Sequence, residues 1–199
     1  WEGLLPLRKN VLEQRRRTLG EEHLDTLTSM HNLAFMYFDT GRTNEAASLF
    51  EQTVAIQRRV LGDEHPTTLI AMGNLAVAYS ELGHSQEAVT LEERVLATSR
   101  RVLGEEHNNT LADMTLLTLF YAELDRFAEA RTLFEQALGT YRRVFGEQSV
   151  LTAEAMNLYA WTILNSGPEE RRNENAEEAL RLAERACTLV EKGADTSWR

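Results

Sequence analysis

Apolar residues recur along this chain at the spacing of amphipathic helices. Between Thr26 and Thr40, the apolar residues are three or four positions apart, as on one face of a helix: Leu27, Met30, Leu33, Ala34 and Tyr37. A second run, from Asn44 to Val60, has its apolar side at Ala46, Leu49, Phe50, Val54 and Ile56. Alternation with period two, which is typical of strands, is not found. The pattern therefore predicts an all-α protein built from pairs of helices.

The helix pair repeats with a period of 42 residues. Leu-Gly occurs at 19–20, 61–62 and 103–104, Phe-Gly follows at 145–146, and the first two copies share 20 of 42 positions. We expect one continuous domain in five parts. These are the second helix of a partial preceding repeat (1–18), three repeats (19–60, 61–102 and 103–144) and a fourth repeat (145–199) with a seven-residue insertion near 168–175.

Glycine and alanine mark the turns and the close contacts of each copy. Gly41 and Gly83 follow the first helix, where a left-handed cap is expected, and the third copy has Asp125 there. A small residue recurs at one place in the second helix, where neighbouring helices must approach closely: Ala46, Ala88, Ala130 and Ala179. One helix pair cannot bury its own apolar face, whereas stacked pairs can, so the repeat predicts a solenoid.

The repeat resembles the tetratricopeptide repeat. The pattern N-L-A-x-x-Y-x-x-x-G-x-x-x-E-A is carried by Asn32-Leu33-Ala34, Tyr37, Gly41 and Glu45-Ala46. The linker L-G-x-E-H-P-x-T-L (61–69) and the 42-residue period are similar to the kinesin light chain type of this repeat. The same subtype occurs in the C-terminal sensor regions of nucleotide-oligomerising immune-type receptors and in other signalling ATPases. The resemblance implies a right-handed superhelical solenoid of antiparallel helix pairs.

The resemblance also implies that the first helices line a concave, partner-binding groove. At the family's usual groove positions, an apolar row (Phe35, Val77, Leu119, Trp161) runs beside the amides of Asn32 and Asn74. Packing between neighbouring first helices is the alternative role for these side chains. The candidate binding residues are His31, Asn32, Phe35, Phe38, Asn74, Val77, Glu81, Thr115, Leu119, Asn157, Trp161 and Asn165. The same mapping includes Asp39, Glu123, Leu158 and Leu164.

Two polar features recur with the repeat and have structural explanations. His23, His65 and His107 are in register, followed by Ser149. Stacked helices hold equivalent atoms about 8–10 Å apart or more, too far for one zinc ion with ligands at about 2 Å, so we expect these residues to shape the entry of each first helix. Arginine pairs end the second helices (16–17, 58–59, 100–101, 142–143), and acidic residues follow them, which predicts an Arg/acid seam between repeats.

Composition narrows the function classes. With 21 Lys+Arg against 31 Asp+Glu, the net charge is −10, which argues against nucleic-acid and anionic-membrane partners. The single cysteine, Cys187, cannot form an internal disulfide and falls at a predicted core position, so we expect a cytoplasmic location. No metal-binding or nucleotide-binding motif is found, and the carboxylates are not paired in a pocket. We expect neither an enzyme nor a bound cofactor.

Three functions fit these observations. The first is a non-enzymatic module that binds a protein or peptide segment in its groove, within the sensor or regulatory region of a larger signalling protein. The second is a cargo adaptor of the kinesin light chain type. The third is self-assembly into a homo-oligomer through exposed repeat ends, because the chain starts in mid-repeat and Leu4, Leu5 and Leu12 could expose an unpaired apolar face.

Overall fold

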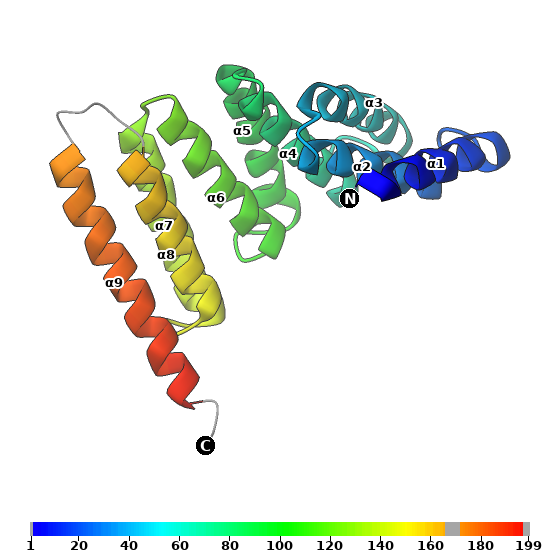
Figure 1. The fold of residues 1–199 in the computed structure, drawn as a ribbon. Coiled ribbons are helices and arrows are strands. Elements are labelled where there is room, and N and C mark those ends of the chain that lie inside the picture. Colours follow the sequence, from blue (N-terminus) through cyan, green and yellow to red (C-terminus); the bar gives the residue numbers. More distant parts are fainter. Residues whose placement is uncertain (1, 166–171, 197–199) are drawn as a thin grey trace. The chain divides into compact units, whose positions relative to one another are not determined.

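The computed structural model describes the backbone of residues 2–165 and 172–196 and the side chains of residues 3–164 and 176–188 (Figure 1). Within these ranges the chain is helical and contains no strand, so the predicted all-α class is confirmed. The elements are η1 (Glu2–Leu4), α1 (Leu5–Leu19), α2 (Leu24–Asp39), α3 (Thr43–Leu61), α4 (Pro66–Glu81), α5 (Ser85–Val102), α6 (Asn108–Glu123), α7 (Phe127–Phe145), α8 (Val150–Asn165) and α9 (Arg172–Thr196).

The first helices of the pairs begin at matching positions. They start at Leu24, Pro66, Asn108 and Val150, which are 42 residues apart, and each is 16 residues long. The first of them begins two residues earlier than the apolar spacing predicts, because His23 provides its N-cap. The repeat period is therefore visible in the helices themselves.

The turn inside each pair has a left-handed residue where the sequence predicts one. Gly41 and Gly83 have φ angles of 72° and 79°, and Asp125 takes the same place with φ 58°. The next amide closes each turn by donating to a carbonyl five residues back; Arg42 N donates to Tyr37 O at 2.8 Å, and Arg126 N donates to Tyr121 O at 2.8 Å. The third turn thus keeps the shared geometry with a residue that is strained in it.

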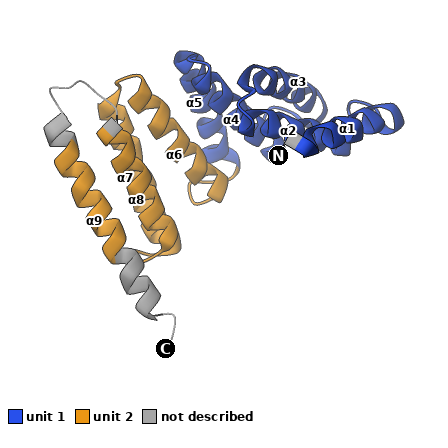
Figure 2. Ribbon diagram, in the orientation of Figure 1, with its two compact units in different colours: residues 1–102 blue, residues 103–199 orange. Residues whose placement is uncertain are grey.

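The chain forms two compact units, residues 1–102 and residues 103–199 (Figure 2). In unit 1, α1 packs on α2, α2 on α3, α3 on α4 and α4 on α5. In unit 2, α6 packs on α7, α7 on α8, and α8 on α9 and α6. The division between the units coincides with the predicted boundary between the second and third repeats. The repeat boundaries and the single continuous domain stay predictions.

Each unit has a core that follows the repeat register. The alanine expected at close helix contacts is buried in every copy; Ala46 and Ala88 are 0% exposed, Ala130 is 1% and Ala179 is 5% exposed. The methionines of the first helices (Met30, Met72, Met114, Met156) are buried beside them. An alanine at this place lets the helices of a pair approach closely, as the sequence predicts.

Two sequence-based expectations about apolar residues are wrong. Leu12 is buried and Leu5 packs against the same core, so of the three leucines expected on an open face only Leu4 is exposed. The reason is that α2 already covers this side of α1. Cys187 is exposed rather than buried. Its equivalents Val54 and Leu96 are buried, whereas no described helix follows α9 to cover Cys187.

The insertion predicted near 168–175 lies partly outside the described residues. The structure describes no backbone for 166–171, and α9 begins at Arg172. The backbone of residues 172–175 is therefore helical, not part of the loop that the sequence predicts up to Asn175.

Candidate functional site

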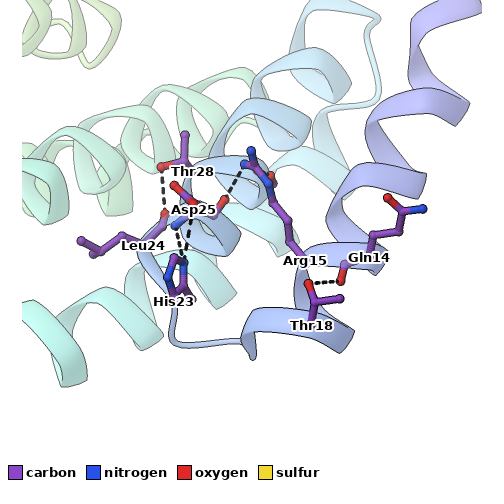
Figure 3. Close-up of polar contacts among 8 residues, drawn as sticks. Gln14, Arg15, Thr18, His23, Leu24, Asp25 and Thr28 are labelled. Atoms are coloured by element: carbon purple, nitrogen blue, oxygen red, sulfur yellow. Dashed lines mark hydrogen bonds and ion pairs between the residues drawn. The ribbon is translucent and has the colours of Figure 1, made fainter.

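Each first helix is entered through a side chain that caps it. The imidazole Nδ1 atoms of His23, His65 and His107 accept hydrogen bonds from the amides two residues later, at 3.1, 3.2 and 3.1 Å. Ser149 Oγ accepts from Leu151 N at 3.2 Å in the fourth copy. Figure 3 shows His23 in this role beside Asp25. The predicted structural role of these residues is confirmed.

The histidines of this row are not arranged as the ligands of one metal ion. Each ring uses Nδ1 for its own helix cap. Among the residues that the structure describes, no three His, Cys, Asp or Glu side chains are placed to hold a metal ion together.

The arginine pairs form the predicted seam with acidic residues. In three of the four pairs, the second arginine contacts an acid 37 residues earlier, at the start of the same repeat: Arg59 contacts Glu22 at 2.6 Å, Arg101 contacts Glu64 at 2.6 Å, and Arg143 contacts Glu106 at 2.7 Å. First arginines contact the next loop, as Arg142 does with Glu147 at 2.8 Å. These guanidinium groups are engaged with carboxylates, so the pairs are not a phosphate-binding row.

In unit 1, two predicted groove residues contact each other. Asn74 Nδ2 lies 3.1 Å from His31 Nε2, which links α2 with α4. The His31 ring also meets Phe50 edge-on, with ring centroids 5.5 Å apart. Burial lowers the pKa of His31 below its ordinary value, so the neutral ring, which can accept the amide hydrogen, is favoured. Packing between first helices, the alternative role, is therefore the one that this pair shows.

The equivalent place in the next repeat holds a residue that the sequence analysis missed. Glu92, on α5, is completely buried where α3 and α7 have Phe50 and Phe134. A methyl group at Gly73 would lie 3.6 Å from Glu92 Oε2, so the carboxylate occupies the space over Gly73. The alignment of the repeats could have revealed Glu92, because an acid stands there at a core position that is aromatic in the first and third copies.

The other candidates of unit 1 differ in exposure. Phe35 is 49% exposed, and Asn32 and Glu81 are also exposed. Phe38 is half-buried against the core, and Val77 is half-buried. Among the candidates of this unit, Phe35, Asn32 and Glu81 are thus the exposed ones, and their contact with a partner stays a prediction.

In unit 2, the exposed candidates lie on α8. Trp161 is 64% exposed, and Leu158 and Leu164 beside it are 36% and 50% exposed. Asn157 is exposed as well. The side chain of Asn165 lies outside the described residues, although its backbone ends α8. These residues make α8 the helix with the most open apolar face among the four first helices.

The candidates on α6 are more enclosed. Leu119 is half-buried. Thr115 is half-buried too; its hydroxyl donates to Leu111 O at 2.9 Å and lies 3.4 Å from the Tyr141 hydroxyl. We give the name α6–α8 face to a set of exposed and half-exposed side chains at groove positions of these two helices, together with Glu154; it comprises Leu116, Leu119, Glu123, Glu154, Asn157, Leu158, Trp161 and Leu164. A groove that runs through both units stays a prediction.

Two hollows outside the predicted groove also follow the repeat. One is lined by Leu12, Arg16, Leu33, Tyr37 and Glu45, among others, and a second by their equivalents Val54, Arg58, Leu75, Tyr79 and Glu87. A third hollow, on η1, α1 and α2, includes the predicted groove residue Asn32 beside Leu4, Leu7 and Val11. Each of the first two hollows is lined by both arginine and glutamate, so neither has a single charge sign that would select one class of ligand.

None of the described helices has the length and apolar content of a membrane span.

Burial raises the pKa of Tyr79 to about 12, and its hydroxyl donates to Glu51 Oε1 at 2.9 Å. The pKa of Tyr159, which stacks on Phe134, is also raised to about 12 by burial. Both phenols are therefore neutral at physiological pH.

The chain matches known repeat proteins over nearly its whole length. The tetratricopeptide repeat family matches residues 4–59, 31–101 and 114–166. Two crystal structures of the nearly identical repeats of a putative kinesin light chain from Podosopora anserina are 30% identical to it, with TM-scores of 0.81 and 0.77. They cover 98% and 100% of this chain and 89% of their own.

A more distant structure has the same fold. BtubC (BKLC) from P. vanneervenii is 18% identical, with a TM-score of 0.67 over 100% of this chain and 93% of that one. No curated protein matches the chain. The helix pairs, the 42-residue period and the family match over more than half of the residues agree: the chain belongs to the tetratricopeptide repeat family.

Proposed function

We propose that this chain is a non-enzymatic binding module that holds a peptide or protein segment on the exposed faces of its first helices. Tetratricopeptide repeats typically serve as scaffolds for protein interactions. The observation that carries the proposal is the exposure of Trp161, whose 64% exposed ring lies between exposed leucines on α8. Aromatic side chains of this kind are common anchors of protein interfaces.

The proposal extends to the role of the module. In a larger signalling protein, the array would form the sensor or regulatory region, located in the cytoplasm, and its partner would be a protein and neither nucleic acid nor a membrane.

An adaptor role of the kinesin light chain type is the second candidate, favoured by the 30% identity to the repeats of a putative kinesin light chain. Homo-oligomers through the repeat ends are the third candidate, and the exposed Leu4 of η1 and the exposed Leu7 and Val11 of α1 support it.

A peptide selection tests the central proposal. A phage-displayed library of random peptides is selected on the immobilised chain, and the consensus peptide is titrated by calorimetry. We expect Trp161→Ala to weaken its binding by at least tenfold, about 1.4 kcal/mol, with unchanged helix content. The matched control is Leu180→Ala, which removes an exposed apolar side chain of α9 and should leave the affinity unchanged. Equal affinity for wild type and Trp161→Ala would contradict the proposed site.

A further inference from the structure

The first helices differ from the rest of the chain in charge. No lysine or arginine lies in α2, α4, α6 or α8, so all 21 basic residues belong to other parts of the sequence. The same four helices carry six carboxylates: Asp25, Asp39, Glu81, Asp113, Glu123 and Glu154. The helices expected to meet a partner are therefore acidic or neutral, although arginine is abundant elsewhere.

On the α6–α8 face, two of these carboxylates flank an apolar stripe. Leu158, Trp161 and Leu164 lie on one side of α8 at intervals of three residues and are 36%, 64% and 50% exposed. Glu154 is exposed one turn before Leu158 on the same helix. Glu123 is exposed at the last residue of α6, which packs on α8.

Neither α6 nor α8 contains a lysine or an arginine. The nearest arginine after α6 is Arg126, which contacts an acid and a ring next to the end of that helix. Its Nε donates to Glu129 Oε2 at 2.8 Å, and its guanidinium lies over the Tyr121 ring at 4.2 Å. The C-terminal end of α6 adds the partial negative charge of its carbonyl groups beside Glu123.

We infer that the segment bound on the α6–α8 face is a basic amphipathic one from another protein. This inference rests on the proposed function and names the chemistry of the partner. Its apolar side chains pack on Leu158, Trp161 and Leu164, and its Lys or Arg residues meet Glu154 at one end and Glu123 at the other. A second copy of this chain fits less well, because two such faces would place carboxylates against carboxylates.

The test uses two synthetic probes that differ only in charge. Both are amphipathic peptides of equal length with leucines on one side; one has lysines at the remaining positions and the other has glutamates. Calorimetric titration into the full chain is expected to show binding of the lysine peptide at least tenfold tighter than that of the glutamate peptide. Trp161→Ala is expected to reduce the binding of the lysine peptide by at least tenfold.

A charge reversal then identifies the carboxylates. Glu123→Lys with Glu154→Lys should weaken the lysine peptide at least tenfold and strengthen the glutamate peptide. The matched control, Glu177→Lys with Glu184→Lys on α9, changes the net charge equally and should alter either affinity by less than twofold. Both control positions are exposed and lie outside the α6–α8 face.

Five results would overturn the inference. The first is that the lysine peptide does not bind. The second is that the control pair on α9 has the same effect as the α6–α8 pair. The third is that the lysine peptide still binds Trp161→Ala with unchanged affinity, as expected for general attraction to an acidic protein. The fourth is a dimer in light scattering that Trp161→Ala converts to a monomer, which would make a second copy the occupant. If the glutamate peptide binds better and depends on Trp161, the inference fails while the proposed function stands.

Discussion

At the scale of single residues, equivalent positions in the repeat share a backbone but not a chemistry. The place of His31 holds Gly73 in the next copy and Thr115 in the third. The side chain facing it changes in step, from Phe50 to the buried Glu92. Such exchanges let a constant fold present different surfaces, so a binding role must be argued for each copy separately.

Asp125 is a strained residue whose repair should stabilise unit 2. It has φ 58° where the other copies have Gly41 and Gly83. Because only glycine adopts this conformation without strain, Asp125→Gly should raise the free energy of unfolding by about 1 kcal/mol, measured by urea denaturation. The reverse change, Gly83→Asp, should lower it by a similar amount, since a Cβ at Gly83 meets no atom within 4 Å and only the backbone conformation opposes it. A loss of stability in Asp125→Gly would show that the aspartate contributes more than its strain costs.

His31 should make unit 1 less stable in mild acid. Its pKa is lowered in the folded chain because the ring is buried, so the unfolded chain binds protons more readily. The stabilising neutral state is fully present above the unfolded pKa of about 6.5, and the benefit is lost as the pH falls through the lower, folded value. Urea denaturation at pH 7.5 and pH 5 should show a larger loss for wild type than for His31→Gln, which does not titrate. An equal loss in both proteins would exclude His31 as the cause.

At the scale of helices, stability depends on how closely the two members of a pair approach. Ala88 is 0% exposed, and the helix α5 that carries it packs on α4. The seam of arginines and acids lies at the surface, with Arg59 and Glu22 66% and 61% exposed. Exposed ion pairs contribute little individually, so the alanine contacts dominate the packing and the seam mainly favours one register.

Overpacking at Ala88 tests this view. Ala88→Leu should lower the free energy of unfolding by about 1–3 kcal/mol, because the larger side chain forces the helices of the pair apart. The matched control is Ala97→Leu, the same substitution at an exposed position of the same helix. Thermal unfolding followed by circular dichroism measures both. Unchanged stability in Ala88→Leu would mean that the close contact lies elsewhere.

At the scale of the whole molecule, the sequence predicts the fold far better than it predicts the site. Strong periodicity and fixed spacing indicate the helix pairs, the left-handed turns and the capping histidines, because each depends on local chemistry. The burial of Leu12, the exposure of Cys187 and the contact of His31 with Asn74 depend on which helices pack next to them. A mapping of groove positions from one repeat cannot distinguish Trp161, which is 64% exposed, from the half-buried Val77 and Leu119.

Hydrogen–deuterium exchange with a selected peptide tests most directly the claim that the first helices bind the partner. Bound peptide should slow the exchange of amides in α8 and α6, and Trp161→Ala should remove that protection at the same peptide concentration. The second helices α7 and α9 should exchange at the same rate with and without peptide. Protection confined to α7 or α9, or protection of α8 that persists in Trp161→Ala, would contradict the account.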